Sequence, residues 1–360
     1  MKKILVVDDS ALMRRVLCDI IDSDERFQVV ARATNGLEAF DLISRNQYDA
    51  VVLDVNMPKM NGLQLLKELQ KYKIPARVMM ASTDTRQGAQ TTLDALELGA
   101  LDFIHKPDNA LDCRVDTFKE ELLRILEVVA DSKLPSFDSK EKQQTTKKVT
   151  NHLVDIIQKA PLKVPGNKIV AIASSTGGPK SLQQVIPRLP GNLDAPVLIV
   201  QHMPKGFTAT LADRLDSLSQ LKVVEAQDGD VLEKGCVYVA MGGRHMNVHT
   251  APGGRYTIRY SDEPTREGVR PCANYMYESL ANSHFDNIVC VVMTGMGADG
   301  TVGIKNLEEK KKVHVIAQDQ ESCVVFGMPK SIITAGLSDQ VVSLDQIAQE
   351  IILQVGVEHQ

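Results

Sequence analysis

Tryptophan is absent from this sequence of 360 residues, and aromatic residues of all kinds make up only 4% of it. No apolar run approaches the roughly 20 residues that a membrane-spanning helix needs. The apolar stretch after the first two lysines is also too short for the core of a signal peptide. The 41 basic residues are outnumbered by 46 acidic ones, which argues against a basic face that binds nucleic-acid phosphates. We therefore expect a cytoplasmic protein that neither inserts into a membrane nor binds nucleic acid.

Cysteine is also sparse. The six cysteines are spread along the chain, and none of them forms a C-x-x-C pair. That pair is the spacing that zinc sites and redox motifs commonly use. We expect reduced thiols that are mostly buried, and no zinc site built from cysteine.

What the sequence does contain is two stretches in which strand-like apolar runs alternate with amphipathic helical ones. Residues 1–129 show five runs of each kind, which predicts an open parallel sheet with helices on both faces. Residues 130–165 are polar and typical of a linker, with one short amphipathic piece at 153–157. Residues 166–356 return to the alternation and predict a second, doubly wound α/β domain.

The second domain is less regular than the first. Between its strand-like runs, residues 237–240 and 256–260 resemble a small excursion of shorter strands around glycine turns. The topology of this domain is therefore less certain from the pattern than that of the first.

Three carboxylates of the first domain follow strand-like runs. Asp8 and Asp9 end the first run and Asp54 ends the third, while Ser82 and Lys106 follow the fourth and fifth. Each acid alone is explained by helix capping, but the carboxyl ends of parallel strands meet at one ligand-binding edge. Carboxylates gathered there repel one another unless a cation such as Mg²⁺ is bound. The set predicts that Asp54 accepts a phosphoryl group, with a hydroxyl and an ammonium group as its partners.

These residues resemble the motifs of response-regulator receiver domains. The matching stretches are ILVVDDSALMRR, VVLDVNMPKMNG and GALDFIHKP. The resemblance implies a flavodoxin-like fold and phosphorylation of Asp54 by a chemotaxis histidine kinase. It also implies that Asp8, Asp9 and Asp54 hold Mg²⁺.

The same resemblance implies a switch that responds to phosphorylation. It assigns this role to Ser82, Phe103 and Lys106. It further implies that the bond between Lys106 and Pro107 is cis, an isomer whose cost is low only before proline.

A nucleophile candidate opens the second domain. The segment Ala173-x-Ser175-x-Gly177 is close to the G-x-S-x-G elbow, in which a sharp strand–turn–helix presents a serine. Backbone N–H groups from Thr176 onward lie at the start of the following helix, where they are suited to a developing oxyanion. Ser175 is therefore the candidate nucleophile.

Two further residues follow strands of the same domain. His202 ends the next strand-like run, and Asp299 lies in the loop after a later one. Three parallel strands would bring both to Ser175, which would complete a triad of nucleophile, base and orienting acid. Each residue alone also fits a cap or a turn. The chain order Ser, His, Asp differs from that of the α/β-hydrolases, so that superfamily is not predicted.

Two rival functions remain open on residue patterns alone. Gly295-x-Gly297-x-x-Gly300 follows a strand and Asp319 lies further on, as in the fingerprint of an NAD-type oxidoreductase. That fingerprint normally opens its domain, whereas this one comes late. The other rival is a non-catalytic scaffold that only binds a receptor.

The second domain resembles the CheB-type chemotaxis methylesterases. The matching stretches are IASSTGGP, QHMPKGFTATLADRLD, GGRHM, VVMTGMGADG and CVVFGMPKSI. The resemblance implies a serine hydrolase that demethylates glutamate γ-methyl esters and deamidates glutamines on the cytoplasmic domains of chemoreceptors. It implies oxyanion donors at Thr176 and Met296 and no cofactor in this domain. We expect the chain to act as a monomer.

The chain departs from the pattern of that family at five positions. Ala173 and Ser174 stand where glycine and alanine are usual, Met241 where proline is usual, and Cys272 and Asn274 where serine and aspartate are usual. The hydroxyl of Ser174 adds a second candidate beside Ser175, and the register with the two glycines that follow selects Ser175.

Overall fold

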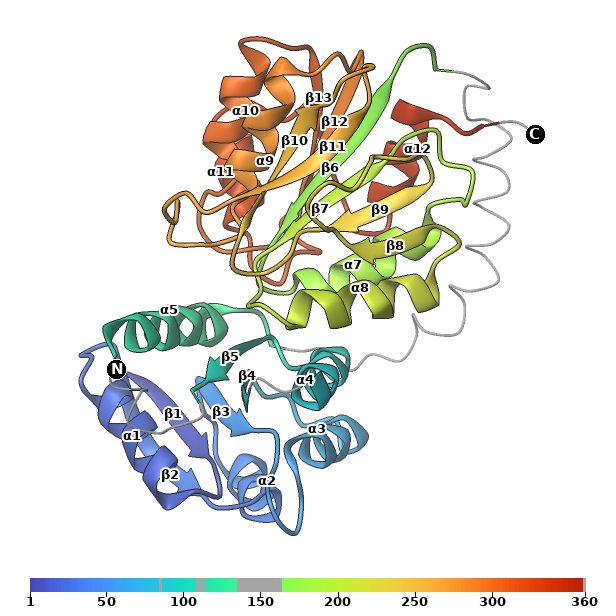
Figure 1. Ribbon diagram of the computed structural model, residues 1–360. Helices are drawn as coiled ribbons and strands as arrows, with labels where there is room; N and C mark the ends of the chain where they lie inside the picture. Colours follow the sequence, from blue (N-terminus) through green and yellow to red (C-terminus); the bar gives the residue numbers. More distant parts are fainter. Residues whose placement is uncertain (84–85, 108–112, 114, 135–163, 359–360) are drawn as a thin grey trace. The chain divides into compact units, whose positions relative to one another are not determined.

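A computed structural model of the chain describes residues 1–83, 86–107, 113, 115–134 and 164–358 (Figure 1). The chain divides into two compact units, Met1–Ser139 and Lys140–Gln360. Most of the expected linker, including the amphipathic piece at 153–157, lies outside the described residues.

The first unit contains a parallel sheet of five strands in the order β2-β1-β3-β4-β5. This order is typical of flavodoxin-like folds, and the predicted fold class is confirmed. The strands are β1 (Lys2–Val7), β2 (Phe27–Ala33), β3 (Ala50–Asp54), β4 (Val78–Thr83) and β5 (Asp102–Lys106). The helices are α1 (Ala11–Asp22), α2 (Gly36–Arg45), α3 (Gly62–Lys71), α4 (Arg86–Glu97) and α5 (Asp116–Asp131).

Local sequence explains where the helices of this unit begin. The hydroxyl of Ser10 accepts the N–H of Met13 at the start of α1. Asn61 and Gln64 form a reciprocal capping box at the start of α3. Such caps satisfy N–H groups that have no partner inside the helix. The central strand β3 is buried at every position, as expected of a strand covered on both faces.

The expected cis bond between Lys106 and Pro107 is not found. Within the described residues, the cis peptide bond joins Arg270 and Pro271. The expectation was wrong because proline only reduces the preference for trans to about 0.5–1 kcal/mol and does not reverse it.

The second unit contains a parallel sheet of seven strands in the order β14-β13-β12-β6-β7-β9-β8. Its strands are β6 (Lys168–Ser174), β7 (Val197–Gln201), β8 (Lys222–Glu225), β9 (Cys236–Val239), β12 (Asn287–Val292), β13 (Val313–Gln318) and β14 (Gln340–Val342). The helices are α7 (Gly178–Val185), α8 (Phe207–Leu218), α9 (Ala273–Ser279), α10 (Thr301–Glu308), α11 (Met328–Thr334) and α12 (Ile347–Val355). Two short 3₁₀ helices are η2 (Ile186–Arg188) and η3 (Leu280–Asn282).

The two segments expected as short strands, residues 237–240 and 256–260, both fall on strands, but these strands belong to different sheets. The second of them falls in β11 (Tyr256–Ser261), which pairs only with β10 (His245–Thr250) in an antiparallel hairpin. The first corresponds to β9, which lies between β7 and β8 in the main sheet. Periodicity alone does not tell to which sheet so short an apolar run belongs.

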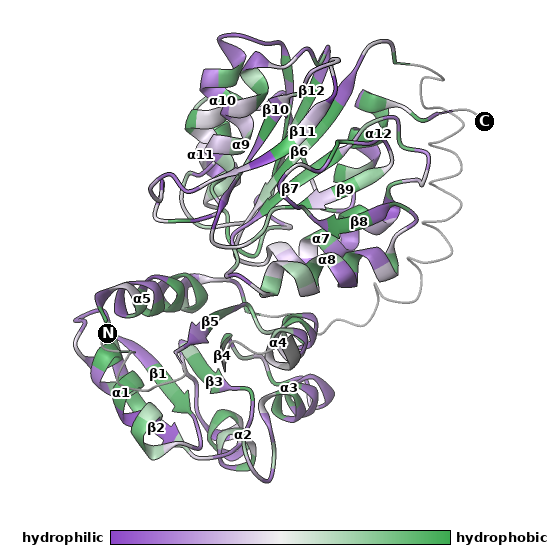
Figure 2. Ribbon diagram, in the orientation of Figure 1, coloured by the Kyte–Doolittle hydropathy of each residue, from purple (hydrophilic) through white to green (hydrophobic). Residues whose placement is uncertain are grey.

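The core of the second unit is formed along its central strands. All seven residues of β6 and all five of β7 are buried, and Figure 2 shows the hydrophobic colour along both. Near-continuous apolar strands are what a parallel sheet with two covered faces requires. Among the described helices of the whole chain, none is long and apolar enough to cross a bilayer.

The order of the strands creates a switch point at β6. The chain passes from β6 to β7 on one side, and much later β12 pairs with β6 on the other side. Open α/β sheets bind their ligands at the carboxyl ends of strands at such a point. The loops that follow β6, β7 and β12 therefore meet at one edge.

Candidate functional sites

The first unit has an acidic pocket at the carboxyl edge of its sheet. Asp8 and Asp54 are only 1% and 6% exposed, whereas Asp9 is exposed. Carboxylate oxygens of the three residues all lie within 4.8 Å of one another. The Nζ atom of Lys106 lies 3.0 Å from Oδ2 of Asp8 and also contacts Oδ1 of Asp54. The structure thus brings together four of the residues that the sequence placed here.

Burial controls the charges in this pocket. It raises the pKa of Asp54 to about 6; Asp8 adds to the shift, and Lys106 opposes it. Burial would lower the pKa of Lys106, but the two carboxylates outweigh it and raise that pKa. A cluster of carboxylate oxygens fits a hard dication such as Mg²⁺, so the donor set suits the ion that a receiver is expected to bind.

The two other switch candidates lie on the neighbouring strands. Ser82 is 1% exposed near the end of β4, in register with His105 and one residue beyond Ala81, the partner of Asp54. Phe103 is buried inside β5, three residues before Lys106. Ser82 therefore reaches the edge of the sheet, while Phe103 packs below it.

In the second unit, the serine and the histidine follow adjacent strands. Ser174 and Gln201 are register partners at the ends of β6 and β7, and Ser175 and His202 come directly after them. The backbone N–H of His202 donates to the carbonyl of Ser174 at 3.1 Å. The sheet itself therefore places Ser175 beside His202.

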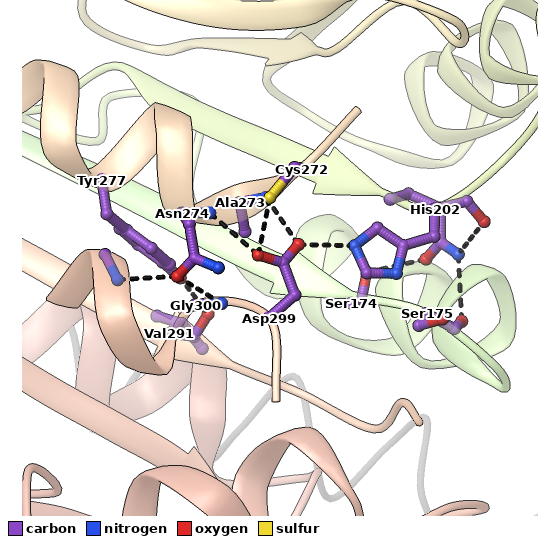
Figure 3. A network of polar contacts seen from close by, with 12 residues as sticks. Ser174, Ser175, His202, Cys272, Ala273, Asn274, Tyr277, Val291, Asp299 and Gly300 are labelled. Carbon is purple, nitrogen blue, oxygen red and sulfur yellow. Dashed lines mark hydrogen bonds and ion pairs between the residues drawn. The ribbon is translucent and has the colours of Figure 1, made fainter. Parts of the chain in front are cut away.

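Asp299 comes to the same place from the loop between β12 and α10. Its Oδ2 atom lies 2.7 Å from Nε2 of His202. Figure 3 shows Asp299 and Ser175 on opposite sides of the His202 ring. The ring therefore turns Nε2 toward the acid and leaves Nδ1 for the hydroxyl of Ser175.

The turn around Ser175 is held by its backbone. Its N–H donates to the carbonyl of Thr294 at 3.0 Å, and its carbonyl accepts the N–H of Gly178 at 2.7 Å. Within the described residues, its hydroxyl makes no hydrogen bond to the ring of His202. Hydrogen bonds of this kind often tighten only when substrate is bound.

Asp299 is a buried carboxylate surrounded by donors. It is 1% exposed and accepts the N–H groups of Ala273 and Asn274 at 2.6 and 2.9 Å. The Sγ atom of Cys272 donates at 3.0 Å. Burial alone would raise the pKa of Asp299, but the hydrogen bonds from His202, Ala273 and Cys272 outweigh it and lower that pKa. An ionised Asp299 can accept a hydrogen bond from Nε2 of His202, which is the arrangement found between an orienting acid and its histidine.

Two of the departures from the family pattern lie in this network. Cys272 supplies an S–H donor where a serine hydroxyl is usual. Oδ1 of Asn274 accepts the N–H groups of Gly300 and Gly303 at 3.1 and 2.6 Å (Figure 3). Asn274 thereby ties the start of α10, and with it the loop that carries Asp299, to the start of α9.

The two expected oxyanion residues are neighbours in the chain of Ser175 and of Gly295. Thr176 is 5% exposed, and its carbonyl accepts the hydroxyl of Thr294 at 3.0 Å. Met296 is half-buried in the loop after β12. A Cβ at Gly295 would lie 2.7 Å from Cβ of Ser175, so glycine is needed to let this loop pack directly against Ser175.

The late glycine motif is explained without a dinucleotide. Gly297 and Gly300 have φ angles of +82° and +98°, a region that favours glycine, and Gly295 lies against Ser175. Asp319, which would bind a ribose in that hypothesis, instead accepts the N–H and hydroxyl of Ser322. The oxidoreductase interpretation is not favoured.

Comparisons with known proteins match both units of the chain. A family model described as "CheB methylesterase" matches residues 170–351, and one described as "Response regulator receiver domain" matches residues 4–114. The chain therefore combines a receiver with a domain of the methylesterase class.

Relatives share this arrangement over their full length. "Protein-glutamate methylesterase/protein-glutamine glutaminase 1" of Syntrophomonas wolfei is 43% identical, covering 98% of this chain and 98% of the relative. The protein of the same name, without the number, from Bacillus subtilis is 40% identical, with the same coverage of both chains. The crystal structure of the Thermotoga maritima CheB methylesterase catalytic domain is 43% identical, with a TM-score of 0.50, over 52% of this chain and 98% of that one. The chain belongs to the family of protein-glutamate methylesterases/protein-glutamine glutaminases.

Sequence reasoning gave no role to Gln201, although this residue bonds to the backbone of the site. Its amide donates to the carbonyls of Ser175 and His202 at 3.0 and 3.2 Å. The only signal in the sequence is a polar residue at the end of a buried strand, directly before His202. That signal does not reveal where the amide points.

We expect Asp299→Asn to slow the reaction of Ser175 with a fluorophosphonate by roughly 10⁴-fold, because an amide stabilises the wrong tautomer of the histidine. The rate of covalent labelling measures this. Asp213→Asn, on an exposed position of α8, is the control and should react as the wild type does. Equal labelling rates for the two variants would contradict the role of Asp299.

We expect Cys272→Ala to be less stable than Cys272→Ser by about 1–3 kcal/mol, because only serine keeps a donor to the buried carboxylate. Since the pKa of Asp299 is lowered in the folded state, this contribution is fully present above the ordinary aspartate pKa of about 3.9. It is lost as the pH falls through the folded pKa. Urea unfolding of both variants at neutral pH measures the difference. Equal stability would show that a hydrogen-bond donor at position 272 contributes nothing to the free energy of unfolding.

Proposed function

We propose that this chain hydrolyses glutamate γ-methyl esters and deamidates glutamines on the cytoplasmic domains of chemoreceptors, with Ser175, His202 and Asp299 as its catalytic residues. The observation that carries the proposal is the 2.7 Å contact between His202 Nε2 and Asp299. It directs the other ring nitrogen toward Ser175 at the switch point of the sheet. The names of the full-length relatives support the substrate class.

Both reactions are acyl transfers through one mechanism. Nδ1 of His202 takes the proton of the Ser175 hydroxyl as its oxygen attacks the side-chain carbonyl of the substrate. The backbone N–H groups of Thr176 and Met296 stabilise the oxyanion. The protonated ring then gives its proton to the departing methanol or ammonia. Water, activated by the same nitrogen, releases the glutamate carboxylate and restores Ser175.

The first domain is proposed to regulate this activity. Asp54 accepts a phosphoryl group from the chemotaxis histidine kinase, and Asp8, Asp9 and Asp54 hold Mg²⁺. The bound ion would neutralise the carboxylates and the phosphoryl oxygens. Lys106 and Ser82 then pair with the phosphate, and Phe103 repacks as part of the switch. The phosphoryl group adds negative charge and three acceptor oxygens, which are able to order or release a surface that binds another domain.

The order of the domains suggests how the signal is used. In this proposal the domain of residues 1–129 covers the cleft of the domain of residues 166–356 until it is phosphorylated, with residues 130–165 as a linker. Phosphorylation then changes access to Ser175 and not its chemistry. The chain is proposed to act as a cytoplasmic monomer.

We expect Ser175→Ala to lower methanol release from methylated receptor fragments by at least about 10⁴-fold, because the nucleophile is lost. A fluorophosphonate should label the wild type and Ser174→Ala but not Ser175→Ala. Wild-type methanol release by Ser175→Ala would refute the assignment. Saturable binding of NADH would instead support the oxidoreductase alternative. Failure of the fluorophosphonate to label the wild type would support the non-catalytic scaffold.

We expect acetyl phosphate with Mg²⁺ to raise the methylesterase activity of the wild type by about 5–150-fold, the usual range of allosteric coupling. Asp54→Asn should show no increase, because an amide cannot accept the phosphoryl group. Asp41→Asn, on an exposed position of α2, is the control and should respond like the wild type. Equal stimulation of Asp54→Asn would exclude Asp54 as the regulatory site.

A further inference from the structure

Two buried polar residues outside the triad connect the strands that carry Ser175 and His202. Ser174 is 0% exposed and Gln201 is 1% exposed. The hydroxyl of Ser174 donates to Oε1 of Gln201 at 2.7 Å. Nε2 of Gln201 donates to the carbonyls of Ser175 and His202, at 3.0 and 3.2 Å. One side chain thus bonds to the backbone of both the nucleophile and the base.

The orientation of the Gln201 amide follows from these partners. Carbonyl oxygens only accept hydrogen bonds, so the NH₂ group must face Ser175 and His202. The amide oxygen is then the group that faces Ser174, and the serine hydroxyl must be the donor. Because each of the two N–H bonds has its own carbonyl, the amide bridges the two residues without sharing a proton.

Close packing holds this amide in place. A Cβ at Gly178 would lie 2.0 Å from Oε1 of Gln201 and 2.9 Å from Cβ of Ser174. Glycine at this position therefore leaves the space that the Gln201 amide occupies. The start of α7, which follows the Ser175 turn, is fitted around the Ser174–Gln201 pair.

The pairing also separates the two serines. Ser174 is fully buried, and its hydroxyl donates to the amide oxygen of Gln201. The ring of His202 is bonded to Asp299 and does not bond to Ser174. Ser174 therefore acts through Gln201 and is not a competing nucleophile.

We infer that Gln201 is a positioning residue for the esterase reaction and that Ser174 orients its amide. This inference rests on the proposed function, in which Ser175 attacks and His202 takes its proton. The sheet places these two residues side by side, and the Gln201 bridge holds their backbones at that position beyond the ends of the strands. Its loss leaves the carbonyls of Ser175 and His202 without these donors and frees the turn to shift. A displacement of about 1 Å is enough to cost about 100-fold in rate.

The test is Gln201→Met, which keeps the length of the side chain and removes its donors. We expect kcat for methanol release, expressed per site that a fluorophosphonate can label, to fall by about 10–100-fold. KM should stay within about twofold, since binding of the ester does not use the bridge. The pH at which the rate is half-maximal should not move, because the base is unchanged. A purely structural role would reduce the number of labelled sites but not the rate per site.

Ser174→Ala keeps the test decisive if Gln201→Met does not fold. It removes only the orienting hydroxyl, and kcat per labelled site should fall by about 3–10-fold, as for one neutral hydrogen bond. The control is Ser283→Ala, since Ser283 is another buried serine whose hydroxyl bonds only to a nearby carbonyl, that of Leu280. Its rate per site should equal that of the wild type.

The results for these variants separate the inference about Gln201 from the proposed function. Gln201→Met with kcat within about twofold of the wild type overturns the inference. If Gln201→Met is unfolded, a kcat for Ser174→Ala equal to that of Ser283→Ala overturns it. In the double variant, the loss should equal that of Gln201→Met alone, because the two residues act as one unit. Activity in Ser175→Ala would instead overturn the proposed function, so the two failures are distinguishable.

Discussion

One buried hydrogen bond, between Asp299 and His202, joins segments of the second unit that are far apart in the sequence. A carboxylate with 1% exposure is stable only if its lost hydration is replaced. Here the replacement comes from His202, from the N–H groups of Ala273 and Asn274, and from Cys272. Those donors oblige the start of α9 to lie against the loop after β12. The same contacts that stabilise the charge therefore assemble the site from segments that are far apart in the sequence.

Each unit has its polar site at the carboxyl edge of its own sheet, but the pKa of the buried carboxyl group is shifted in opposite directions. In the first unit, a buried lysine faces a cluster of carboxylates, and burial raises the pKa of Asp54 to about 6. In the second, hydrogen bonds from His202, Ala273 and Cys272 lower the pKa of Asp299. A buried carboxylate whose negative charge is poorly stabilised by its neighbours gains most from binding a cation or from modification. One whose charge is well stabilised stays an anion, which suits an acid that orients a histidine throughout a reaction.

The residues at the carboxyl edges of the two sheets could be predicted from the sequence, because the prediction needed only the ends of the strands and their parallel pairing. Asp8, Asp54, Ser175 and His202 each follow an apolar run, and parallel pairing brings such positions together. Prediction failed where the outcome depended on partners distant in the sequence. The pattern did not tell that the short strand β9 belongs to the main sheet, and the bond before Pro107 is not cis. The roles of Cys272, Asn274 and Gln201 depend on where side chains point, which no pattern in the sequence reports.

The departure at position 174 shows how a single hydroxyl affects its surroundings. A fully buried hydroxyl must be paired, and the acceptor available to Ser174 is the amide oxygen of Gln201. Because the amide oxygen of Gln201 accepts this bond, its NH₂ group faces the carbonyls of Ser175 and His202. With alanine at this position, those two carbonyls alone would orient the amide. In the proposed mechanism, Ser174 thus supports Ser175 and does not compete with it, and we infer that residues 174 and 201 act together.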